Sequence, residues 1–259
     1  MFRPAILFAV IFWPILLLPQ QDVELEVRQA SEKLLNIQRN WGPKMNTSGV
    51  TISLTPTQNG QLGDHSYAGY RLYESGLPKN AVFVLNSFPI DLKLRKMLDG
   101  ITFSDRGEAI CAGKPGTCTG DKPNDDIDLK FVAADGEPIR LGLISEDGQY
   151  KAFVSIVPFP IQARDGNCFV QAIRLLPGFE LALLQGTGFP KDAEIKVDSA
   201  SEGEKHAWSD KADNEGNVQL ALAPGVKGKS RGTVMTTLSS PACKLTIKFD
   251  WGKGTYRLH

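Results

Sequence analysis

The sequence is poor in the residues that most often carry catalysis. It has three histidines, His65, His206 and His259, and no Gly-x-Ser-x-Gly motif of a nucleophile elbow. Asp64, His65 and Ser66 are consecutive, and neighbours in an extended chain point to opposite faces, so they form no ready-made triad. We therefore expect a protein that is not an enzyme and has no cofactor. A hydrolase whose site is assembled from distant loops is the least favoured alternative.

The sequence also lacks an excess of charge of either sign. The 29 basic and 29 acidic residues cancel, and the pI is about 6.8. A nucleic-acid partner is therefore not expected, because such proteins carry a basic footprint for the phosphate backbone. An apolar fraction of 42% is typical of a globular protein, and 259 residues are enough for two domains.

Long apolar runs are absent after the first residues of the chain. Arg3 precedes an uncharged apolar run over residues 5–18, and a polar break follows. This layout is typical of a secretory signal peptide, residues 1–21, and the run is short for the ~20 residues of a membrane-spanning helix. We predict export to the periplasm or the cell surface. No small-residue pair marks a cleavage point, so an uncleaved anchor that holds the domains outside the membrane is the alternative.

Cysteine is scarce, and its spacing fits neither zinc nor redox chemistry. Zinc sites usually need four closely spaced ligands, and thioredoxin-like pairs have the form Cys-x-x-Cys, whereas Cys111 and Cys118 enclose a Gly-Pro turn. In an exported chain, a disulfide that closes this turn is the remaining explanation. Cys168 and Cys243 begin strand-like segments, in which each shares parity with inward-facing apolar residues, so we predict a second disulfide between them.

Helical periodicity is rare. Residues 22–41 are the exception, because apolar residues recur at steps of three and four from Val23 to Trp41, and Gly42-Pro43 follows. We predict an amphipathic helix that packs on the first β domain, with a self-associating seam as the alternative. A shorter helix is expected over residues 89–100, where it would cross from one sheet to the other.

From residue 49 onward, turn dipeptides separate short apolar or alternating runs. Asp99-Gly100, Asp147-Gly148 and Asp165-Gly166 are among these dipeptides. The pattern predicts an all-β fold of two tandem immunoglobulin-like β-sandwiches, residues 49–160 and 166–259, preceded by the signal segment and the short helix.

The expected strands are spread evenly over both halves. The segment 158–167, with two prolines and an Asp-Gly turn, is the expected boundary between the sandwiches. We predict strands at residues 50–54, 67–73, 81–86, 129–133, 137–144, 151–159, 168–175, 179–186, 193–199, 217–223, 232–238 and 243–251.

Three motifs in residues 178–251 carry a resemblance. They are a Gly-x-Gly-Phe-Pro turn at 186–190, an Asp-x-x-Gly turn at 213–216 before a strand, and a later strand that begins at Gly232. This segment resembles the bacterial immunoglobulin-like modules of the IPT/TIG type. The resemblance implies a β-sandwich that presents surfaces or separates other domains, and it implies no catalytic residues.

An acidic loop lies beside the smaller predicted disulfide. Clustered carboxylates repel one another, and a hard cation such as calcium would relieve that repulsion. The EF-hand pattern does not fit, so calcium is the alternative to a solvated loop. The residues concerned are Asp121, Asn124, Asp125, Asp126 and Asp128.

A strand with three tyrosines is the candidate carbohydrate site. Tyr67 and Tyr73 share one face of the expected strand and Tyr70 takes the other, so the first two could stack on sugar rings. Ordinary sheet packing is the simpler explanation, because aromatic residues are common in strands.

A short basic loop is the candidate contact with an anionic envelope polymer. It contains Lys227, Lys229 and Arg231, and a solvated hairpin is the simpler explanation. Taken together, these patterns predict an exported, non-catalytic module that contacts another protein or an envelope polymer through its loops or an exposed sheet edge. Carbohydrate or wall-polymer binding is the alternative function, and the membrane is a partner only through an uncleaved N-terminal segment.

Overall fold

The computed structural model describes residues 20–90, 93–112 and 126–259, with side chains from residue 29 onward. The chain is all-β, as predicted, apart from helix α1 (Gln20–Asn40) and a short 3-10 turn, η1 (Pro43–Met45). Most of the predicted signal peptide lies outside the described residues. Within them, no helix is long and apolar enough to cross a membrane.

Two antiparallel sheets form the first sandwich. The core lies between them, where Ile52 and Leu72 of one sheet meet Leu85 and Leu141 of the other. One sheet contains β1 (Thr51–Pro56), β2 (Gly60–Leu62), β3 (His65–Ser75) and β7 (Asp128–Phe131), with β3 pairing to the other three strands. The second sheet has the order β6 (Ala109–Cys111), β5 (Arg95–Phe103), β4 (Phe83–Ser87), β8 (Ile139–Ser145) and β9 (Lys151–Ile156).

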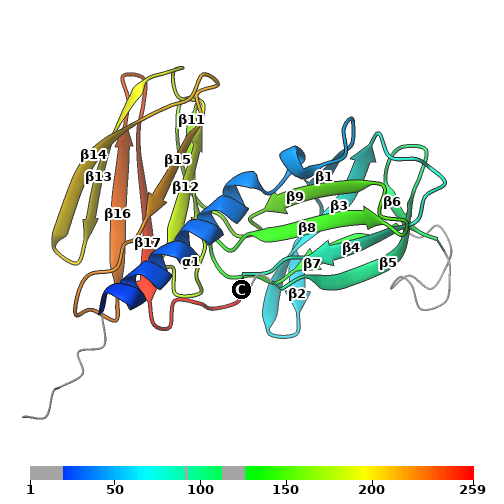
Figure 1. Cartoon of the computed structure of the whole chain (residues 1–259), viewed down its shortest axis with the longest axis horizontal. Coiled ribbons are helices and arrows are strands. Elements are labelled where there is room, and N and C mark those ends of the chain that lie inside the picture. The colour runs from blue at the N-terminus through cyan, green and yellow to red at the C-terminus, as the bar shows by residue number, and fades with distance from the viewer. Residues whose placement is uncertain (1–19, 91–92, 113–125) are drawn as a thin grey trace, which may run out of the picture.

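Two further antiparallel sheets form the second sandwich, on the left of Figure 1. One sheet has the order β10 (Ile161–Asp165), β11 (Cys168–Arg174), β12 (Ala182–Thr187) and β15 (Val218–Leu222). The other has the order β14 (Glu204–Lys211), β13 (Glu194–Ser201), β16 (Arg231–Ser239) and β17 (Lys244–Gly252). Strand β10 lies within the segment expected to separate the sandwiches, and it pairs with β11.

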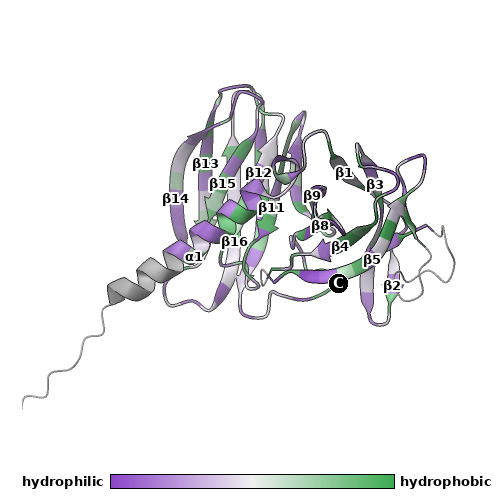
Figure 2. Ribbon diagram, turned by 45° about the vertical axis from the view of Figure 1, so that its right-hand side comes forward, coloured by the Kyte–Doolittle hydropathy of each residue, from purple (hydrophilic) through white to green (hydrophobic). Residues whose placement is uncertain are grey.

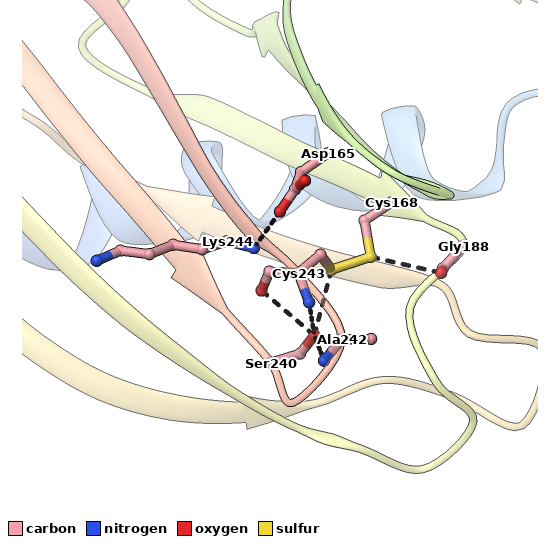
Figure 3. Close-up of a disulfide and its surroundings, with 7 residues drawn as sticks. All are labelled: Asp165, Cys168, Gly188, Ser240, Ala242, Cys243 and Lys244. Carbon is pink, nitrogen blue, oxygen red and sulfur yellow. Dashed lines mark hydrogen bonds between the residues drawn. A yellow bond between two sulfur atoms is a disulfide. The ribbon is translucent and has the colours of Figure 1, made fainter.

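The disulfide Cys168–Cys243 joins the two sheets of the second sandwich, as predicted (Figure 3). Its Cα atoms lie 6.4 Å apart, and both cysteines are buried. Beside it, the backbone N–H of Lys244 donates a 2.8 Å hydrogen bond to the Asp165 carboxylate. The covalent bond therefore joins the start of β11 to the residue before β17, and the hydrogen bond joins the neighbouring β10 to β17 at the same end of the sandwich. Cys111 is buried at the end of β6, but Cys118 lies outside the described residues, so that disulfide stays a prediction.

The helix expected over residues 89–100 is wrong, because much of this segment is in strand β5. Leu98 pairs with Leu85 and Ile101 pairs with Phe83, so β5 has one residue more than β4 between the two pairs. Gly100 takes a positive φ of 68°, which accommodates the extra residue as a bulge. The apolar spacing fits a helix, but pairing with β4 and β6 gives β5 its backbone hydrogen bonds and buries Ile101.

Helix α1 confirms the predicted helix but not its predicted position. Leu34 packs on Ile173 and Leu183, which lie on the outer face of the second sandwich. Figure 1 shows α1 crossing the sheet that contains β12 and β15 and reaching the first sandwich only at its C-terminal end. The described part of α1 alternates polar and apolar residues along its length (Figure 2). The amphipathic helix therefore covers an apolar patch on the outer face of the second sandwich, and the sequence pattern alone did not locate that patch.

Candidate functional site

The junction between the sandwiches is held by the end of α1. Trp41, just after the helix, stacks on Phe88 with ring centroids 5.1 Å apart and meets Phe153 edge-on at 5.3 Å. Its indole Nε1–H donates a 3.1 Å hydrogen bond to the carbonyl oxygen of Val154. Because Leu34 packs on the second sandwich, the helix and its following residue contact both sandwiches.

A buried arginine joins α1 to β8. The guanidinium Nε of Arg140 donates a 2.7 Å hydrogen bond to the side-chain oxygen of Gln38, and the Arg140 residue is 1% exposed. Burial lowers the pKa of Arg140 to about 10, and the nearby Glu137 carboxylate acts in the opposite direction. Arg140 is thus a buried cation under the helix. Gln38 and the Phe88 carbonyl oxygen accept its hydrogen bonds, and Glu137 is the nearby opposite charge.

A second buried arginine, Arg174, joins three loops. It donates to the carbonyl oxygens of Asp135 at 2.8 Å, Pro177 at 2.6 Å and Thr255 at 3.4 Å. Its guanidinium lies 4.3 Å from the centre of the Phe179 ring. Burial lowers the pKa of Arg174, while Glu137 and Asp135 oppose that shift. Within the described residues, no carboxylate oxygen lies within 4.0 Å of this guanidinium, so carbonyl dipoles provide its direct contacts.

The last residues of the chain cross back to the first sandwich. Tyr256 donates to both carboxylate oxygens of Glu137 at 3.1 Å, and burial, with help from Glu137, raises the pKa of Tyr256 to about 12. The His259 ring stacks on Phe159 with centroids 3.9 Å apart and lies 2.7 Å from an Asp135 oxygen. The two sandwiches are therefore connected both by α1 and by this tail, and each contacts the first sandwich through its own residues.

One hollow opens between the edge strands β14 and β15. It has a volume of about 320 Å³. Trp208, Leu222 and Val226 line it with apolar surface, and Glu204 and His206 lie among its polar lining. Within the described residues, β14 pairs only with β13, and β15 pairs only with β12. This side of the second sandwich therefore has two unpaired sheet edges with a hollow between them.

A larger groove lies beside β17. Its volume is about 830 Å³, and it is bordered by β10, the start of β16, the end of β17 and the tail that follows. Five basic side chains line it: Arg174, Arg231, Lys248, Lys253 and Arg257. Thr233, Thr255 and three acidic residues complete its polar lining.

The tyrosine side chains of β3 all contact neighbouring residues of the same sandwich. Tyr70 is buried in the core, and Tyr67 and Tyr73 are half-buried on the other face, as their parity predicts. The Lys130 ammonium lies 5.1 Å from the centre of the Tyr67 ring, and the Tyr73 hydroxyl donates to Glu108 at 3.4 Å. These contacts leave the carbohydrate role of the tyrosines as a prediction with no added support.

The basic loop divides between two surroundings. Lys227 and Lys229 are exposed in the connection between β15 and β16 and line neither hollow. Arg231, the first residue of β16, lines the groove beside β17. The structure therefore separates one member of the predicted cluster from the other two.

Most of the candidate calcium ligands lie outside the described residues, namely Asp121, Asn124 and Asp125. The two that are described, Asp126 and Asp128, both contact Arg71, at 3.3 Å and 3.2 Å. Within the described residues, no group of three or more potential metal ligands occurs. The calcium site stays a prediction. A calcium ion there would compete with Arg71 for the carboxylates of Asp126 and Asp128.

The histidines lie near acceptors rather than near nucleophiles. His65 Nδ1 lies 3.2 Å from the backbone oxygen of His259, His206 lies 3.8 Å from Glu204, and His259 contacts Asp135. In the part of the chain that the structure describes, no serine side chain is hydrogen-bonded to a histidine.

The residues that sequence reasoning missed are Arg140, Arg174 and Tyr256, which organise the junction.

Comparisons with known proteins assign no family to this chain. No family model matches it, and no curated protein matches it. Among solved structures, a DUF3823 family protein from Bacteroides ovatus ATCC 8483 is 7% identical, with a TM-score of 0.19, over 80% of this chain and 99% of that one. The BSP domain of a biofilm-associated protein is 10% identical, with a TM-score of 0.20, over 86% of this chain and 55% of that one. The similarity to IPT/TIG modules therefore stays a resemblance of sequence motifs.

Proposed function

We propose that this chain is an exported, non-catalytic binding module that contacts another protein through the open side of its second sandwich. The observation that supports this most directly is the pair of unpaired edge strands, β14 and β15, on either side of the hollow. An edge strand offers a row of N–H and C=O groups at a spacing that another extended backbone matches. The expected occupant is therefore an extended segment of a partner protein.

The side chains at the hollow indicate what that segment carries. A strand added to β14 would direct alternate side chains toward Trp208, Leu222 and Val226, which favour apolar residues. The Glu204 carboxylate in the same hollow favours a basic residue at one of these positions. The proposed partner segment therefore alternates apolar and basic residues on the side that faces the hollow.

The charges of β14 make this edge selective. Glu204, Lys205, Asp210 and Lys211 are exposed, and charged residues on an edge strand oppose pairing with arbitrary strands. A partner with complementary charges would pair, and a mismatched one would be repelled.

Export is supported by two independent features. The first residues have the pattern of a secretory signal, and the chain forms the Cys168–Cys243 disulfide. Disulfides persist in oxidising compartments such as the periplasm and the cell exterior. The proposed place of action is accordingly the cell surface or the periplasm.

The test is co-sedimentation of the purified chain with envelope material of the source cells, before and after protease treatment of that material. We expect protease to abolish binding. His206→Lys would place a cation in the hollow and weaken binding about tenfold, whereas Ala207→Lys places the same charge on the opposite face and leaves it unchanged. Bound material should also slow amide exchange in β14. Protease-resistant binding, or equal losses in the two variants, would overturn the proposal.

A further inference from the structure

The groove beside β17 gathers positive charge on a protein whose formal net charge is zero. Arg231, Lys248, Lys253 and Arg257 line it and are all exposed. They come from β16, β17 and the tail, so the fold gathers them from separate parts of the sequence. Its volume of about 830 Å³ is within the roughly 300–1,000 Å³ typical of ligand sites.

These four cations have no carboxylate partners among the residues that the structure describes. Within the described residues, no carboxylate oxygen lies within 4.0 Å of any of them, and the only side-chain hydrogen bond among them joins Arg257 to the carbonyl oxygen of Gly254, at 3.0 Å. The acids of the groove therefore do not pair with these cations, and its five basic side chains outnumber its three acidic ones.

The acids of the groove are engaged with other partners. Glu202 accepts a 2.9 Å hydrogen bond from the backbone N–H of Thr233, and Asp250 accepts one of 2.6 Å from the Thr233 hydroxyl. Asp135 contacts His259. Each carboxylate retains lone pairs that can accept further hydrogen bonds, but none is free to move onto a neighbouring cation without breaking these contacts.

The buried Arg174 adds to the positive field from the back of the groove. It is 2% exposed, and its direct contacts are the carbonyl oxygens of Asp135, Pro177 and Thr255. A charge held at low dielectric is screened less by water than an exposed one. An anion in the groove would therefore feel Arg174 as well as the four exposed cations.

We propose that this groove binds an acidic glycan, whose anionic groups contact the cations while its hydroxyls donate to Glu202 and Asp250. Glu202 and Asp250 can accept hydrogen bonds from hydroxyls, which a polymer with anionic groups alone does not offer, so the mixture of charges favours a sugar chain. Phe249 and Trp251 are buried, so recognition rests on charge and hydrogen bonds rather than on ring stacking. The acidic groups are carboxylates or phosphates, which offer the cations the same chemistry. This inference is independent of the proposed docking at β14, because the groove and the hollow share no lining residue.

The experiment is calorimetric titration of the full chain with four probes. Oligogalacturonate carries carboxylates, a phosphomannan oligosaccharide carries phosphates, dextran is neutral, and inorganic polyphosphate has charge without hydroxyl donors. We expect binding of one or both acidic glycans, weakened by added salt, with no binding of dextran and weaker binding of polyphosphate. Failure of both acidic glycans to bind, or polyphosphate binding at least as tight as theirs, would overturn the proposal.

Two charge-reversal variants locate the site. Arg231→Glu with Lys253→Glu changes the groove, whereas Lys227→Glu with Lys229→Glu makes the same change of net charge in the neighbouring loop outside it. We expect the groove variant to weaken glycan binding at least about tenfold and the loop variant less than about twofold. His206→Lys in the β14 hollow should leave glycan binding unchanged. Equal losses in the two charge-reversal variants would show that only overall charge is sensed and would refute the groove as the site.

Discussion

Gln38 on α1 accepts a 2.7 Å hydrogen bond from the buried guanidinium of Arg140, across 102 positions of sequence. Removing the amide in Gln38→Ala would leave a buried cationic donor without its partner, which costs about 1–3 kcal/mol of the free energy of unfolding. Urea denaturation at neutral pH measures this loss. The exposed Lys33→Ala on the same helix should change stability by less than about 0.5 kcal/mol. If Arg140→Met restores stability in the Gln38→Ala background, the unpaired charge is the cause.

Tyr256 makes the junction sensitive to alkaline pH. Its two hydrogen bonds to Glu137 require the protonated hydroxyl, and its pKa is raised from 10.0 to about 12 in the folded chain. A raised folded pKa stabilises the fold fully below the unfolded pKa, and the contribution is lost as pH rises toward the folded value. Tyr256→Phe should therefore be less stable than the native chain by about 1 kcal/mol at pH near 8, with the difference shrinking between pH 10 and 12.

Urea unfolding at a series of alkaline pH values measures this difference. Tyr150→Phe is the control, because the Tyr150 hydroxyl has no hydrogen bond within the described residues. A difference for Tyr256→Phe that stays constant with pH would contradict the assignment of the hydroxyl as the titrating group.

The Cys168–Cys243 disulfide closes a long loop and should contribute strongly to stability. Replacing both cysteines by alanine is expected to cost about 4 kcal/mol in the chain-entropy model. The predicted Cys111–Cys118 disulfide closes a much shorter loop, so the corresponding double alanine variant should lose only about 2.5 kcal/mol. Guanidinium unfolding without reductant measures both variants. A larger loss for the shorter loop would show that strain or local contacts, rather than chain entropy, dominate.

Trp41 should determine whether α1 stays attached to the first sandwich. Trp41→Ala removes two aromatic contacts and the hydrogen bond to Val154, and we expect a loss of about 3 kcal/mol. Trp41→Phe keeps ring contacts and loses only the indole donor, so its loss should be nearer about 1 kcal/mol. Hydrogen exchange should become faster in β9 for Trp41→Ala. Trp208→Ala, in the second sandwich, should leave β9 unchanged, and faster exchange there in both variants would contradict a local effect.

The fold was most predictable where a strand has one buried and one exposed face. In β17, the alternation from Leu245 to Trp251 matches buried and exposed positions one for one. The same pattern placed Cys243 on the inward side and led to the correct disulfide partner. Such strands are predictable because the physical cause of the pattern, one face toward the core, is local to the strand.

Five strands had no such pattern or a misleading one. β14 is almost wholly exposed, so nothing in its sequence alternates between apolar and polar. β2 and β6 are three residues long, and β10 lies within residues 158–167, whose prolines and Asp-Gly turn indicate a boundary rather than a strand. In β5, apolar residues at helical spacing were overruled by pairing with β4, which depends on a different part of the chain.

The candidate sites were less predictable than the fold. Arg174 shares parity with Cys168, Val170 and Ala172, so its inward position could be predicted from β11 alone. Arg140 had no such signal, because the helix that covers it lies 102 positions earlier. The cations of the groove come from β16, β17 and the tail, and no spacing in the sequence indicates that they meet.

The second sandwich has unequal sides. On one side its sheets are joined by the Cys168–Cys243 bond, at the start of β11, and by the Lys244–Asp165 hydrogen bond between β17 and β10, whereas β14 and β15 have no described partner beyond their own sheets. Thermal fluctuations should therefore separate the two sheets most at β14 and least at β17. A partner that enters at β14 would meet the portion of the sandwich that yields most readily. The intact disulfide would then limit how far the sheets can separate at β14 before the whole domain unfolds.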